Sequence, residues 1–115
     1  MTKTKYHSTK TTVAGIKFDS KAEAARYVVL MDQLKAGAIR DLKLQAEHTI
    51  QEAFTTPAGE RVRAVRYKAD FQYQRLTEAG AWEDVVEDVK GVRTKEYLLK
   101  RKLLLGRGVV IQEVP

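Results

Sequence analysis

A short acidic strand is the feature that most constrains this chain. Residues 85–91 read Val-Val-Glu-Asp-Val-Lys-Gly, so three apolar β-formers carry two carboxylates and a lysine to a glycine that ends the strand. Side chains two positions apart on a strand share a face, so Asp88 and Lys90 can meet at one point. A carboxylate can hold a hard divalent cation, and an ammonium can position water or stabilise charge on a phosphate. This pairing is typical of a metal-dependent hydrolase.

The same Asp-x-Lys tripeptide occurs at residues 19–21, 41–43 and 88–90, so the tripeptide alone does not define a site. Only the third copy follows an apolar run with a second acid beside it, and only the third lies where a predicted strand ends before a predicted helix. Context therefore selects residues 88–90.

Composition favours one soluble domain. The chain has 115 residues, of which 43% are hydrophobic, enough for a single modest core. Zero cysteines exclude disulfides and thiolate metal sites. The sequence has neither a leading apolar segment nor an 18-residue apolar run, so we expect a cytoplasmic protein with no membrane partner.

Charge is unevenly distributed along the chain. The net charge of +6 favours a polyanionic partner. Residues 90–108 hold seven basic side chains and one acid, whereas residues 75–88 hold one arginine and five acids. A protein that only coats DNA has little use for such acids, but an enzyme that binds phosphates and also holds a cation needs both signs together.

The order of elements predicts one mixed α/β unit, residues 13–115, preceded by a flexible basic arm at residues 1–12. The arm could follow a phosphate backbone or be a solvated terminus without a role. Apolar periodicity and turn residues predict strands over 13–18, 39–51, 65–74, 82–90 and 109–114, and helices over 20–36 and about 94–105. The three middle strands are expected to form an antiparallel meander.

Two acids outside the acidic strand allow more than one interpretation. Ser20 and Glu23 have the spacing of a capping box, but Glu23 also heads the inward stripe of the first predicted helix, where a buried acid needs a partner. Asp70 lies on the polar face of its strand, where it could simply pair with Arg66 or Lys68. Capping, surface pairing and metal binding all stay open at this level.

Three separated motifs carry a resemblance to a known family. They are residues 15–24 (Gly-Ile-Lys-Phe-Asp-Ser-Lys-Ala-Glu-Ala), residues 67–71 (Tyr-Lys-Ala-Asp-Phe) and residues 86–91 (Val-Glu-Asp-Val-Lys-Gly). With the order of the elements, they resemble the PD-(D/E)xK nuclease superfamily, and in detail the phage-borne domain of unknown function family 1064. The resemblance spans about residues 13–111, with alanine at position 69 in place of the superfamily's proline. It implies a restriction-endonuclease-like αβββαβ core with a short extra N-terminal strand.

The resemblance also implies a role for each charged residue of these motifs. Asp70 and Asp88 would be the main metal ligands. The Val89 carbonyl would add an oxygen, and Glu23 would contribute directly or through water. Lys90 would orient or activate the attacking water, although it could also be a solvated lysine at a strand end. Mg²⁺, or Mn²⁺ in its place, is the expected ion, because the sequence offers no cysteine and two histidines for zinc.

Other residues take supporting or DNA-binding roles. Gln45 is a supporting amide near the site or a plain surface amide. Glu87 alternates away from Asp88, so it is expected to face a helix or pair with a base, and it is retained as a second supporting residue. The expected DNA-binding side chains are Lys43, Lys68, Arg93, Lys95, Lys100, Arg101 and Lys102. Leucines surround the second helix, which could line a DNA groove or be partly buried in a dimer.

We therefore expect a metal-dependent DNA endonuclease that hydrolyses phosphodiester bonds in phage or prophage DNA replication, recombination or packaging. Branched DNA such as a four-way (Holliday) junction is one candidate substrate. DNA is the expected partner, and no organic cofactor is expected. A homodimer is one way for so small a core to cut two strands. The expected compartment is the cytoplasm of a bacterial host. The alternatives are a non-catalytic nucleic-acid-binding module of the same fold and a structural or adaptor protein of a phage particle.

Overall fold

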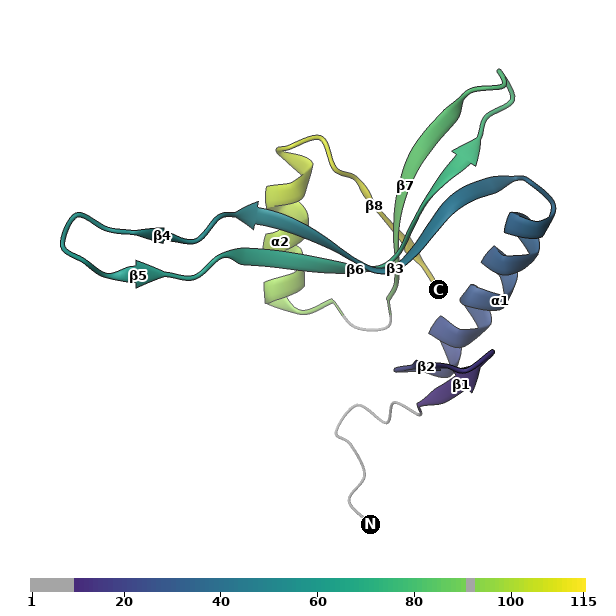
Figure 1. Cartoon of the computed structure of the whole chain (residues 1–115), viewed down its shortest axis with the longest axis horizontal. Helices are drawn as coiled ribbons and strands as arrows, with labels where there is room; N and C mark the ends of the chain where they lie inside the picture. Colours follow the sequence, from purple (N-terminus) through teal and green to yellow (C-terminus); the bar gives the residue numbers. More distant parts are fainter. Residues whose placement is uncertain (1–9, 91–92) are drawn as a thin grey trace, which may run out of the picture.

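The computed structural model describes residues 10–90 and 93–115, and these residues form a mixed α/β unit (Figure 1). The central sheet has the strand order β3-β6-β7-β8. Its strands are β3 (Ile39–Gln51), β6 (Val65–Leu76), β7 (Trp82–Val89) and β8 (Ile111–Val114). The first three pair antiparallel, which confirms the predicted meander, and β8 joins β7 in parallel.

Each helix begins after a side chain that caps its first turn. α1 (Lys21–Lys35) starts after Ser20, whose side chain accepts a hydrogen bond from the Glu23 N–H over 3.1 Å. α2 (Lys95–Leu105) starts after Thr94, which accepts one from the Tyr97 N–H over 3.1 Å. Each cap satisfies a backbone donor that the first helical turn leaves without an intrahelical partner. No helix within residues 10–90 and 93–115 has the length and apolar character needed to cross a bilayer.

Two clusters of buried side chains hold the helices to the sheet. The first packs α1 against Phe71 and Tyr73 of β6. The second packs α2 against Tyr67 and Ala69 of the same strand. Because β3, β6 and β7 each contribute to both clusters, the meander as a whole determines where the two helices lie. Asp70 lies between the two clusters on β6, since Ala69 belongs to the second cluster and Phe71 to the first.

The N-terminal region corrects the prediction of one strand over residues 13–18. β1 (Thr11–Val13) and β2 (Ile16–Phe18) instead form an antiparallel hairpin. Ala14 and Gly15 make its turn with φ of 50° and 80°, values that reverse a chain and that a continuous strand does not contain. Thr11 and Thr12, which we assigned to the arm, thus pair within β1, and residues 1–9 of the arm lie outside the described residues.

A second difference lies beyond the middle strands. The β3–β6 pair continues into a hairpin extension, residues 52–64, in which β4 (Phe54–Thr55) pairs with β5 (Arg61–Val62). Figure 1 shows it projecting past α2, and none of its side chains is buried. The sequence predicted only the turn chemistry of this segment, because two-residue strands have too little periodicity to be recognised.

Candidate active site between β6 and β7

Two aspartates lie where β6 and β7 separate. The paired register of these strands ends at Phe71 and Glu87, and the next residues along are Asp70 and Asp88. The Asp70 N–H donates to Asp88 Oδ1 over 2.7 Å, and the Val89 N–H donates to Asp70 Oδ2 over 2.9 Å. Each carboxylate thus satisfies a backbone donor that the separating strands leave without a ladder partner.

Both aspartates are shielded from solvent, and Lys90 compensates their negative charge only in part. Asp88 is 1% exposed, and its Oδ2 has no hydrogen-bond partner among the described residues. Lys90 Nζ lies 3.4 Å from this oxygen, which makes an ion pair without hydrogen-bond geometry. Burial raises the pKa of Asp70 and of Asp88 above their ordinary values, and the backbone N–H bonds and Lys90 offset only part of this effect.

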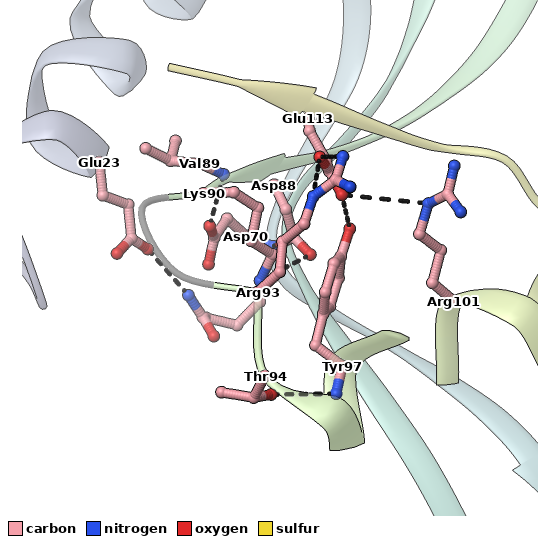
Figure 2. Close-up of polar contacts among 11 residues, drawn as sticks. Glu23, Asp70, Asp88, Val89, Lys90, Arg93, Thr94, Tyr97, Arg101 and Glu113 are labelled. Carbon is pink, nitrogen blue, oxygen red and sulfur yellow. Dashed lines mark hydrogen bonds and ion pairs between the residues drawn. The ribbon is translucent and has the colours of Figure 1, made fainter. Parts of the chain in front are cut away.

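Glu23 reaches the same place from the first turn of α1. In Figure 2 the three carboxylates lie in a row, with Asp70 between Glu23 and Asp88. Glu23 is 6% exposed, and Gln45 Nε2 donates to its Oε1 over 3.1 Å. Burial, followed by the negative charges of Asp70 and Asp19, raises the pKa of Glu23 to about 7. Glu23 is therefore more than a first-turn acid, because it shares a site with the aspartates.

Gln45 holds a backbone conformation that is rare inside a strand. Its φ of +52° lies in the left-handed region, which residues other than glycine seldom adopt. The register on both sides places Gln45 across from Asp70, and a hydrogen bond from its side chain lowers the pKa of that carboxyl. Strained conformations of this kind cost about 1–3 kcal/mol and cluster at functional sites. In this conformation the side-chain amide of Gln45 contacts both Glu23 and Asp70.

Lys90 contacts an aromatic ring on the side away from Asp88. Its Nζ lies 4.1 Å from the centroid of the Tyr97 ring, a cation–π contact. The Tyr97 hydroxyl donates to Glu113 Oε2 over 2.6 Å, and Arg93 pairs with the same carboxylate (Figure 2). These two contacts lower the pKa of Glu113. Sequence patterns did not single out Tyr97, because its contact with Lys90 depends on α2 packing beside β7.

Glu87 does not join the acidic group. It is fully buried, and its carboxylate accepts hydrogen bonds from Arg26 Nε over 2.9 Å and from Arg26 Nη2 over 2.5 Å. The Tyr73 hydroxyl donates to it over 3.4 Å. This confirms that Glu87 faces a helix and pairs with a base. This ion pair fastens α1 to the sheet, and no sequence pattern pointed to Arg26 as the partner.

The predicted DNA-binding side chains form two groups. The first, Lys43 and Lys68, is exposed on β3 and β6. The second lies just before α2 or on it and comprises Arg93, Lys95, Lys100, Arg101 and Lys102. Three members of the second group already contact Glu113 or Glu96. Within this group, therefore, only Lys95 and Lys102 are exposed and have no ion pair to another described residue.

The oxygen atoms at this site suit a hard divalent cation. The buried Asp88 oxygen that lacks a hydrogen bond would gain a partner from such an ion. Within the described ranges, no three His, Cys, Asp or Glu side chains are close enough to enclose an ion by themselves. Mg²⁺ commonly uses one or two carboxylates and completes its shell with water and substrate phosphates. Asp70 and Asp88 fit that pattern.

Fold and site together define a small mixed α/β domain in which three carboxylates and a lysine gather where two sheet strands separate. The chain belongs to the family described as "Protein of unknown function (DUF1064)", whose family model matches residues 3–110. This match confirms the family that the three sequence motifs indicated. Comparison with the curated proteins and with the solved structures finds no match.

Proposed function

We propose that this protein is a metal-dependent DNA nuclease of the PD-(D/E)xK type. The observation that carries the proposal is the buried Asp88 oxygen, which has no hydrogen-bond partner among the described residues and lies beside Asp70 and Lys90. Neutral side chains such as Asn or Ser could cap the separating strands without the desolvation cost of buried carboxylates. Burial raises the pKa of all three acids, and the charges of Asp70 and Asp88 raise the pKa of Glu23 further. Such carboxylates stabilise the fold poorly, so their presence favours a cation-binding role.

The residues of the chain would divide the work of phosphodiester hydrolysis. Asp70 and Asp88 would hold Mg²⁺ or Mn²⁺, with Glu23 and the Val89 carbonyl as further ligands. When bound, such an ion stabilises charge that develops on a phosphate and makes a bound water more acidic. Lys90, placed between Asp88 and the Tyr97 ring, would donate a hydrogen bond that orients the attacking water.

The charge of the chain supports DNA as the substrate class. A net charge of +6 and the exposed Lys43 and Lys68 favour a polyanion beside the acidic site. Phage or prophage DNA replication, recombination or packaging, a preference for branched DNA, and a bacterial cytoplasmic location stay predictions. A homodimer is also a prediction, for which α2 offers exposed leucines: Leu98, Leu99, Leu103 and Leu105.

Cleavage of a labelled DNA panel tests the proposal. The panel contains single-stranded, duplex, flap and four-way junction DNA, each with Mg²⁺, Mn²⁺ or EDTA. We expect metal-dependent cutting by the wild type, a loss of at least about a thousandfold in Asp88→Asn, and wild-type rates in Asp84→Asn. Asp84 is the matched control because it is an exposed aspartate of the same strand.

Other outcomes select the alternatives. If the wild type binds DNA but cuts no member of the panel with either metal, the non-catalytic binding module becomes the better account. If it neither cuts nor binds, the structural or adaptor role becomes the better account. Equal cutting by wild type and Asp88→Asn would place the activity elsewhere in the chain or in a contaminant.

A further inference from the structure

We propose that the hairpin extension, together with the strand ends at its base, grips duplex DNA to one side of the cleavage point. The inference rests on the proposed nuclease function, since it takes the same DNA as its partner. It adds a contact region that extends away from the acidic site, and among the predicted DNA-binding residues only Lys68 lies along it.

The core of the protein does not account for the hairpin extension. Residues 52–64 bury no side chain, and Phe54 is 45% exposed. A two-stranded hairpin is at best marginally stable alone in water, because it has no third layer on which to pack. An extension of this kind, projecting from the end of a sheet (Figure 1), suits a surface that a partner covers.

Basic side chains lead from the acidic site toward this extension. Lys68 and Arg66 occupy alternate positions of β6 before Asp70, so all three share a face of the strand, and both cations are exposed. At about 3.3 Å per residue they lie about 7 Å and about 13 Å along the strand from Asp70. Arg66 pairs with Glu47 over 3.5 Å, but both side chains are about half exposed. A surface pair of this kind contributes little and can be exchanged for a phosphate.

The extension carries two arginines that can meet phosphates. Arg61 lies in β5, and Arg63 follows this strand directly. Both arginines are exposed, and neither has an ion pair within residues 10–90 and 93–115. With Arg66 and Lys68 they make four exposed cations within residues 61–68, a segment that contains no acid. This part of the chain therefore suits contact with phosphates.

The distance from the acidic site to the tip of the extension matches one turn of DNA. Gly59, at its tip, is eleven residues from Asp70, which at about 3.3 Å per residue gives a reach of about 36 Å. One turn of B-DNA rises about 34 Å. A duplex with its scissile phosphate at Asp70 can therefore contact basic side chains over about ten base pairs on that side.

The salt dependence of duplex binding tests this inference without any cutting. Binding is measured by fluorescence anisotropy in EDTA, on one duplex that extends a full turn past the cut and on one that stops near it. Because each phosphate contact contributes about 0.9 to the slope of log affinity against log salt, the double variant Arg61→Gln/Arg63→Gln should lose about 2 from that slope on the long duplex only. The matched control Arg40→Gln/Arg75→Gln removes two charges from the other end of the β3–β6 pair and should leave the slope unchanged.

The outcomes separate this inference from the nuclease proposal. An unchanged slope in Arg61→Gln/Arg63→Gln overturns the grip on DNA, and the cleavage panel still decides the nuclease function by itself. If the slope is unchanged but sedimentation shows a smaller assembly, the extension holds a second copy of the chain and the inference is also overturned. If the slope falls as expected but nothing is cut, the grip stands and the nuclease function falls.

Discussion

Replacing Glu23 by glutamine should make the protein more stable and less active. Each pKa unit corresponds to about 1.4 kcal/mol, so a carboxyl whose pKa rises from 4.5 to about 7 on folding costs about 3 kcal/mol of stability once it is ionised. Below pH 4.5 Glu23 is neutral in the folded and the unfolded chain and has no effect. Between pH 4.5 and 7 only the unfolded chain releases the proton, so the wild type loses stability as the pH rises. Glutamine avoids this loss and can still accept the hydrogen bond from Gln45.

Urea unfolding without divalent ions measures the effect. Glu23→Gln should match the wild type near pH 4.5 and exceed its free energy of unfolding by up to about 3 kcal/mol at pH 8.5. Glu78→Gln, which removes an exposed loop acid, should stay within about 0.5 kcal/mol of the wild type at both pH values. Cutting by Glu23→Gln should fall, because the variant lacks a proposed catalytic carboxylate. Equal stability of Glu23→Gln and wild type at pH 8.5, or the same excess at both pH values, would refute the reasoning.

Three further substitutions probe other parts of the account. Arg26→Leu leaves the buried Glu87 carboxylate without its cation and should reduce the free energy of unfolding by about 3–5 kcal/mol, and a loss below about 1 kcal/mol in urea would show that the pair is dispensable. Tyr97→Leu removes the ring that contacts Lys90 and should lower kcat about tenfold with KM unchanged. Tyr97→Phe keeps the ring, so its kcat should stay within about threefold of the wild type. Equal kcat values in the two variants would show that the ring does not position Lys90. Gln45→Gly relieves a strained φ but loses the hydrogen bond to Glu23, so the free energy of unfolding should change by less than about 1 kcal/mol. The rate of DNA cutting should fall, and a wild-type rate would mean that the amide does not position Glu23.

The sequence predicted the elements around the site well. Ser20 and Thr94 mark the helix starts because capping is a local property, and the long alternating strands are recognisable without tertiary information. The motif residues Glu23, Asp70 and Asp88 do come together, since β6 and β7 are neighbours in a meander and α1 packs against both. Local chemistry and a simple topology were sufficient for this part.

The remaining features depend on contacts between distant segments. Tyr97 meets Lys90 only because α2 packs beside β7, and Glu113 joins them through a parallel strand pair that periodicity does not specify. Arg26 appears as one more basic residue of an amphipathic helix until its partner Glu87 is located. The strained Gln45 is likewise invisible in the sequence, because a non-glycine residue in the left-handed region leaves no mark on the alternating pattern.

Calorimetric titration with Mn²⁺ tests the central claim most directly, because the account depends on Asp70 and Asp88 forming a cation site. The wild type, Asp70→Asn and Asp88→Asn are compared at one pH, with Asp84→Asn as the control. We predict that the wild type and Asp84→Asn bind the ion at the same affinity and that each of the other two variants loses this binding. No binding by the wild type, or equal binding by all four proteins, would contradict the account.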